Sequence, residues 1–226
     1  MRRRLGGLLL LLAIAYLIGE AWAVGGWQGR PYSWTQDAIS ALGVPEVLHS
    51  GEGEIASTRH VAMNATFIAS GARVLLATLV LAPFVPRVRW LVLPLAVVHG
   101  VGTIIVGFYP TGLTAERANM HGLGAVMAIV GGAVLLAAIT AAVAGRHPLL
   151  AVWTAVCALV SLLGCVLALT GVGGFGLVER LAVDAVIVWQ IATGAVLLLA
   201  PASATPASAP PTPHRLEVAR TNPASP

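Results

Sequence analysis

Residues 121–144 read HGLGAVMAIVGGAVLLAAITAAVA and contain no Asp, Glu, Lys or Arg. About 20 apolar residues carry an α-helix across the roughly 30 Å hydrocarbon core of a bilayer, so this stretch predicts a membrane-spanning helix. The whole chain has the same character, since 58% of its 226 residues are hydrophobic and only 10% are charged. Soluble domains carry about 25% charged residues. The composition therefore indicates a membrane protein and excludes soluble, disordered, collagen-like and disulfide-rich classes.

Five more apolar runs of similar length lie on either side of this stretch, and their mostly short connections contain Pro or Gly. They cover about residues 5–24, 61–84, 90–109, 149–170 and 178–200. We therefore expect an all-α, polytopic membrane protein whose residues 1–200 form a six-transmembrane-helix bundle. Residues 201–226 are rich in Pro, Ala and Ser and have no apolar face to bury, which predicts a disordered cytoplasmic tail.

The first run has a second interpretation. The residues Arg2, Arg3 and Arg4 precede it, and Ala21-Trp22-Ala23 near its end has the pattern of a signal-peptide cleavage site. The length of residues 5–24 nevertheless matches a full membrane span. We expect a retained first helix and keep a removable signal peptide as the alternative.

The arginines are unevenly divided between the two sides of the membrane. All 13 basic residues are arginine, and a cytoplasmic N-terminus places eight of them inside and four outside. Because cytoplasmic loops carry the excess of positive charge, this favours a plasma-membrane protein with both termini cytoplasmic and residues 25–59 outside. The arginines are scattered rather than clustered, so we expect the lipid bilayer and not a nucleic acid as partner. The inner set is Arg2, Arg3, Arg4, Arg87, Arg89, Arg146, Arg215 and Arg220, and the outer set is Arg30, Arg59, Arg117 and Arg180.

The long loop contains one helical pattern. Residues 33–36 have the spacing of a capping box, and apolar side chains follow at helical intervals up to Leu42 before Gly43 ends the pattern. We expect a short interfacial helix on the outer surface that covers the space between the spans. Asp37 and Ser40 are then surface residues of this helix.

Polar side chains recur at the outer ends of the second, fourth and sixth spans. An ionisable group inside a bilayer is costly and needs a partner or water, so these side chains are candidates for a shared site. If the three helix faces converge, they form the rim of an outward-facing polar cavity. The rim residues are His60, Asn64, His121, Glu179, Arg180 and Asp184.

A deeper polar layer is expected near the middle of the membrane. Counting about 1.5 Å of rise per residue places Arg73, His99 and Gln190 roughly 12–17 Å from the nearest boundary. Arg73 is too far from the cytoplasmic end of its span to reach water. We therefore expect Arg73 to face the bundle interior and to bond with Gln190, Tyr16 or His99. The expected floor of the cavity consists of Arg73, His99 and Gln190.

The expected function is binding of a lipid, another amphiphile or a small anionic ligand, with Glu179 orienting the planar guanidinium of Arg180. A membrane-embedded metal hydrolase with His60, His121 and Asp184 as ligands is one alternative. A small transporter and a structural or assembly role are the others. No G-x-S-x-G, P-loop or C-x-x-C motif is present, so whether the chain is an enzyme stays open, and we expect no cofactor and no resident metal.

Each candidate residue also has a purely structural interpretation. Carboxylates near helix N-termini are stabilised by the helix dipole without any function. The histidines at the span ends are explained equally well as solvated interfacial side chains. Hydrogen bonds between helices account for Arg73 and His99.

Several stretches, taken in their order along the chain, are similar to a known family. They are WTQDAISALG at 34–43, MNATF at 63–67, VGFYP at 106–110 followed by His121, and GLVERLA at 176–182 followed by Trp189. Together they resemble the domain of unknown function 998 family, a group of small prokaryotic multi-span membrane proteins. The resemblance implies six spans and no assigned activity. It carries Ser40, Asn64, Pro110, His121, Glu179, Arg180 and Trp189 onto the family pattern, whereas Asp184 departs from it.

Overall fold

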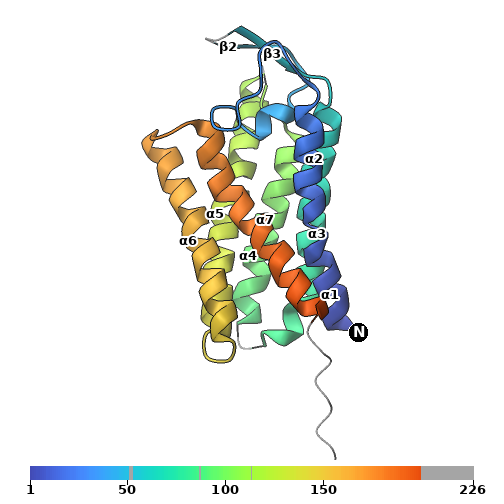
Figure 1. The fold of residues 1–226 in the computed structure, drawn as a ribbon, viewed down its shortest axis with the longest axis vertical. Helices are drawn as coiled ribbons and strands as arrows, with labels where there is room; N and C mark the ends of the chain where they lie inside the picture. The colour runs from blue at the N-terminus through green and yellow to red at the C-terminus, as the bar shows by residue number, and fades with distance from the viewer. Residues whose placement is uncertain (51–52, 87, 113, 200–226) are drawn as a thin grey trace, which may run out of the picture.

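The computed structural model describes residues 1–50, 53–86, 88–112 and 114–199. Within them, six helices are long and apolar enough to cross a membrane. The polytopic, all-α architecture expected from the sequence is therefore confirmed (Figure 1). The spans are α1 (Arg2–Leu11) together with α2 (Ile14–Val24), then α3 (His60–Leu81), α4 (Arg89–Phe108), α5 (Ala115–Val143), α6 (Pro148–Thr170) and α7 (Phe175–Leu199).

The helices pack as a closed ring. α1 packs against α3 and α7, and the ring continues from α3 through α4, α5 and α6 to α7. α5 and α7 also contact each other, which brings α7 close to the centre of the bundle. The start of α1 and the end of α7 lie at one end of the bundle, and the described residues between α2 and α3, 25–50 and 53–59, lie at the other, called here the loop end (Figure 1).

The first span is interrupted, although the sequence predicted one continuous helix over 5–24. At the interruption, the Ala13 N–H donates to the Leu10 carbonyl at 2.9 Å instead of to Leu9, four residues back. The Leu9 carbonyl accepts instead from Nη1 of Arg73 at 2.9 Å. An arginine from α3 therefore satisfies the backbone group that the interruption releases.

The other span boundaries differ from the expected ones by a few residues, except at α5. This helix begins at Ala115 rather than at 121, and the Thr114 hydroxyl caps it by accepting from the Arg117 N–H at 3.3 Å. Charged residues in the first turn hid this start from a reading of apolar runs. A short 3-10 helix, η2 (Ala82–Phe84), follows α3. The tail predicted for 201–226 lies outside the described residues.

The loop forms a small sheet and a 3-10 helix rather than the expected surface helix. The strands are β1 (Trp27–Gln28), β2 (Leu48–Ser50) and β3 (Gly53–Ser57), and the 3-10 helix is η1 (Ser40–Gly43). β3 pairs antiparallel with β1 on one side and β2 on the other, with Trp27 opposite Ser57 and Leu48 opposite Ile55. The capping-box pattern makes only a turn, in which the Asp37 N–H donates to the Ser33 carbonyl at 2.8 Å.

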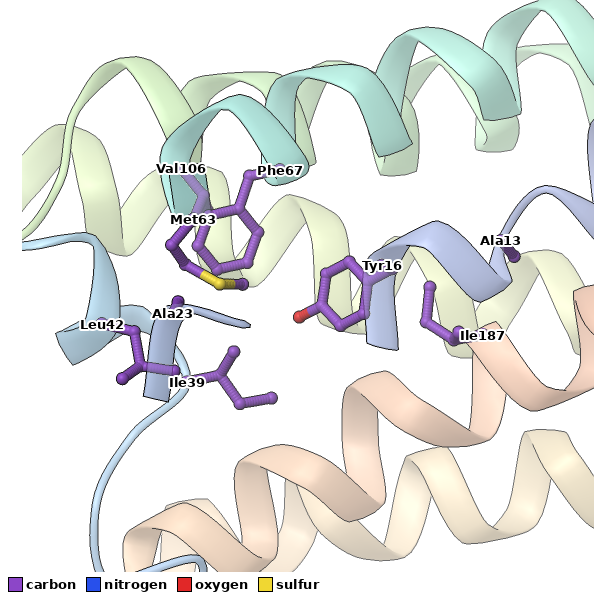
Figure 2. Close-up of a cluster of buried hydrophobic side chains, with 9 residues drawn as sticks. All are labelled: Ala13, Tyr16, Ala23, Ile39, Leu42, Met63, Phe67, Val106 and Ile187. Atoms are coloured by element: carbon purple, nitrogen blue, oxygen red, sulfur yellow. The ribbon is translucent and has the colours of Figure 1, made fainter. Parts of the chain in front are cut away.

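Some of the apolar side chains of the loop are buried inside the bundle, whereas Trp34 remains 48% exposed. Ile39 and Leu42 are 0% exposed and belong to one core cluster with residues of α2, α3, α4 and α7, including Tyr16 and Met63 (Figure 2). Burying such a side chain contributes about 1.5–3 kcal/mol. Asp37 and Ser40 are buried as well, so their predicted place on the surface is wrong. We call residues 32–43 the docked segment.

Candidate functional site

Arg180 holds the docked segment to the bundle. Its Nη1 donates to the carbonyls of Trp34 at 2.8 Å and Asp37 at 3.1 Å, and its Nη2 donates to the Tyr32 hydroxyl at 2.5 Å. Nη2 also forms an ion pair with the Glu20 carboxylate of α2 at 2.6 Å. The guanidinium thus joins α7, α2 and the loop, and it is already occupied by protein groups.

The N-terminus of α7 receives the docked segment directly. The N–H of Gly176 donates to the Gln36 carbonyl at 3.2 Å. The N–H of Leu177 is shared between the Thr35 carbonyl at 2.9 Å and the Gly174 carbonyl at 3.1 Å. A Cβ atom at Gly176 would overlap with the backbone of Asp37. The approach of the loop therefore requires glycine at this position.

Glu179 binds the loop and not its neighbour Arg180. Its Oε2 accepts from the Ile39 N–H at 2.5 Å, and Ser40 donates to the carboxylate from both its N–H and its hydroxyl. The expected pairing of Glu179 with Arg180 is wrong because consecutive residues on a helix point about 100° apart. The adjacent acid and base instead hold two different parts of the docked segment.

Two groups of the docked segment have shifted acidity. Burial raises the pKa of Tyr32 to about 12, although its hydrogen bond with Arg180 opposes the shift. At Asp37, burial alone would raise the pKa, but hydrogen bonds from Arg30 and from the Ser33 N–H outweigh it, and the pKa lies below its usual value. Arg30 contacts both carboxylate oxygens of Asp37, at 2.5 and 2.7 Å. The loop is therefore held together around an ionised Asp37 and a neutral Tyr32.

A cavity of about 50 Å³ lies between the docked segment and α2, α3, α4, α5 and α7. One water molecule needs roughly 10–15 Å³ of such space, so the cavity holds on the order of four waters or one small polar group. The remainder of its lining is apolar and comes largely from α5 and α7, including Ala125 and Ala182. Its polar lining consists of Tyr16, Ser40, Ser70, His99, Thr103, His121 and Glu179.

The two histidines of the cavity are fixed in the same way. Nδ1 of His99 lies 2.7 Å from the Ala128 carbonyl, and Nδ1 of His121 lies 2.9 Å from the Tyr109 carbonyl. A carbonyl only accepts hydrogen bonds, so Nδ1 carries the proton in both rings and Nε2 of the neutral ring is an acceptor. Both imidazoles therefore have Nε2 available for hydrogen bonding.

Of the nine residues predicted to form one site, only His99, His121 and Glu179 line this cavity. His60 and Asn64 bond to loop backbone at the loop end, through Ser57 O at 2.8 Å and Gly43 O at 2.8 Å. Asp184 lies one turn beyond Arg180 on α7, and its buried Oδ1 has no hydrogen-bond partner among the described residues. The expected rim residues therefore do not form one site. His60, Asn64 and Arg180 bond to the loop, whereas His121 and Glu179 line the cavity.

The deep layer is also divided. Nη2 of Arg73 donates to Oε1 of Gln190 at 2.5 Å, which confirms the expected inward contact. The same Nη2 donates to the Ser70 hydroxyl at 3.3 Å, and Ser70 lines the cavity. Arg73 therefore contacts a cavity residue without lining the cavity, and Gln190 is connected to it through Arg73, whereas His99 belongs to the lining.

The metal-hydrolase alternative loses its ligand set. Across the described ranges, no three His, Cys, Asp or Glu side chains are placed to hold a metal ion.

The transporter alternative calls for paired broken helices. Among the described spans, the break between α1 and α2 is capped by Arg73 and has no counterpart in another span. The described helices therefore lack the pair that this alternative needs.

Sequence reasoning missed Glu20 as the partner of Arg180 and Tyr16 as part of the cavity. The sequence did contain a signal for Glu20, because a carboxylate within an apolar span requires a partner. Arg180 lies at the same end of the bundle and is that partner. Tyr16 was recognised only by its depth. Its place in the cavity depends on the docked segment, which supplies Ser40 to the same lining.

The chain belongs to the family described as "Protein of unknown function (DUF998)", which matches residues 4–196. The family match and the six apolar helices together define a multi-pass membrane protein. No curated protein and no solved structure matches the chain.

Proposed function

We propose that this membrane protein binds the headgroup of an amphiphile in the cavity beneath the docked segment. The observation that carries the proposal is one small space lined by a carboxylate, two imidazoles with available Nε2 atoms, and hydroxyl groups. Ligand sites typically combine an apolar wall with a few convergent polar groups in this way. The cavity of about 50 Å³ fits a headgroup and not an acyl chain, so the chain of the amphiphile stays in the bilayer.

A small anionic ligand, the other option suggested by the sequence, is not part of the proposal. That option relied on Arg180, whose guanidinium is engaged by Glu20 and by loop carbonyls. The acidic side chain that does line the cavity is Glu179, whose ionised form repels anions.

Native mass spectrometry of gently extracted protein tests the proposal. We expect a copurified amphiphile in the wild type, and we expect Ala125→Leu, which fills the cavity, to remove it. Ala137→Leu is the matched control, because it makes the same change on an exposed face of α5. Ligand-free wild-type protein, or equal loss from the two variants, would overturn the proposal.

We also propose that the loop end faces the exterior of a plasma membrane, with both termini in the cytoplasm. The support is the sequence, in which eight arginines fall in the segments assigned to the cytoplasm and four in those assigned to the exterior. Protease added to intact cells should cut within residues 25–59 and leave an N-terminal tag intact. Cleavage of the tag with an intact loop would reverse this orientation.

A further inference from the structure

We infer that the ligand of this cavity is a hydrogen-bond donor, namely a headgroup with hydroxyl or amine protons. The inference rests on the amphiphile-binding function proposed above and specifies the chemical class of the ligand. It follows from an account of which polar groups in the lining still have protons to donate.

Most of the polar lining has already used its protons. His99 and His121 donate theirs to the carbonyls of Ala128 and Tyr109. The Thr103 hydroxyl donates to the His99 carbonyl at 2.8 Å. Toward the cavity these three side chains offer only lone pairs, so each can accept a hydrogen bond but not donate one.

The polar groups at the end of the cavity beside the docked segment also accept hydrogen bonds and have no proton left to donate. The Ser40 hydroxyl donates to Glu179, and the Glu179 carboxylate has no proton of its own when ionised. A carboxylate has about four lone-pair directions, and the loop occupies three through Ile39 and Ser40. One acceptor position therefore remains for a ligand.

Tyr16 supplies an independent sign that a ligand belongs here. Its side chain is 3% exposed, and its hydroxyl has no hydrogen-bond partner among the residues described. In Figure 2 this hydroxyl points into the space between Met63 and Ile39. A buried hydroxyl without a partner is costly, and a ligand that both donates and accepts would satisfy it.

The charges near the cavity exclude the opposite class of ligand. The cationic side chains Arg73 and Arg180 are bonded to other groups and do not line the cavity, whereas Glu179 does. A phosphate or carboxylate would find donors in the hydroxyls of Tyr16 and Ser70, but most of the polar lining would offer it acceptors, and the ionised form of Glu179 would repel it. A neutral alcohol or a protonated amine would meet four acceptors from α4, α5 and α7.

The test compares amphiphiles that share one alkyl chain and differ in their donor protons. The protein is placed in phosphatidylcholine nanodiscs and titrated with dodecylamine, dodecyltrimethylammonium, dodecanol, dodecyl methyl ether and dodecyl phosphate. Binding is followed by NMR of the imidazole nitrogens of His99 and His121, because a nitrogen that accepts a hydrogen bond changes its shift.

We expect the amine, the alcohol or both to bind at least about tenfold more tightly than their methylated partners and the phosphate. Preference for the amine or for the alcohol identifies which donor is used. Binding that ignores methylation, or that favours the phosphate, would overturn the donor inference and leave amphiphile binding intact. No saturable binding by any probe would remove the proposed function itself. Ala125→Leu should abolish the donor binding and Ala137→Leu should preserve it, and the reverse would place the site elsewhere.

Discussion

Replacing Arg180 by methionine should release the docked segment. The substitution removes the ion pair with Glu20 at 2.6 Å, and the Glu20 side chain is only 3% exposed. A buried carboxylate left without its partner costs about 3–5 kcal/mol. Undocking lets water reach Glu20, so this cost drives the segment away from the bundle. The lost bonds to the Trp34 and Asp37 carbonyls act in the same direction.

Hydrogen exchange of the protein in nanodiscs measures this effect at the amides of Ile39 and Ser40, which donate to Glu179. Because each 1.4 kcal/mol is a factor of ten, we expect exchange to accelerate by about 100-fold or more. Arg117→Met is the matched control. Arg117 pairs with Glu46 at 2.8 Å, but the two side chains are 46% and 31% exposed. Such a pair is worth about 0–1 kcal/mol, so its loss should accelerate exchange by less than about sixfold.

The unpaired charge of Glu20 drives this release, and a double variant isolates its effect. Glu20→Gln combined with Arg180→Met removes both charges and should recover much of the lost protection. If the two single arginine variants exchange alike, the buried pair does not hold the segment. If the double variant is no better protected than Arg180→Met alone, Glu20 imposes no cost.

Three further predictions address the loop and the interior. Gly176→Ala places a Cβ atom against Asp37 and should destabilise docking by about 1–3 kcal/mol, whereas Gly122→Ala, which meets open space, should not change exchange. Raising the pH from 10 toward 12 should undock the loop, because folding holds the pKa of Tyr32 at about 12, above its ordinary 10.0, and favours the neutral ring. Tyr32→Phe should lack this alkaline step, and a step that persists in it would assign the transition to another group. Arg73→Met should lower the unfolding free energy in detergent by about 1–3 kcal/mol, since it leaves a carbonyl and an amide unpartnered, and an unchanged midpoint in a denaturant titration would refute this.

The spans and the deep contact were predictable because each follows from a single strong constraint. A bilayer requires long apolar helices, so runs such as 121–144 identify themselves. Arg73 sits too deep to reach water, which leaves only a partner at the same depth, and Gln190 is that partner. In both cases, the prediction needs only a count of residues along one helix.

The docked segment was not predictable from spacing. The intervals from Trp34 to Leu42 suit a surface helix, but Asp37 ends the first turn by accepting from the Ser33 N–H and from Arg30. Ile39 and Leu42 then enter the bundle, where N–H groups in the first turn of α7 donate to the loop carbonyls. That outcome depends on a helix whose first residue is Phe175, far away in the sequence.

The pairing of Glu20 with Arg180 has a consequence for biogenesis. Glu20 lies in the first of the described spans, and Arg180 lies in the last of them. Until α7 is inserted, the Glu20 carboxylate has no partner, which is costly within a bilayer and delays insertion of its helix. Chains cut before α7 should therefore be recognised by quality-control proteases.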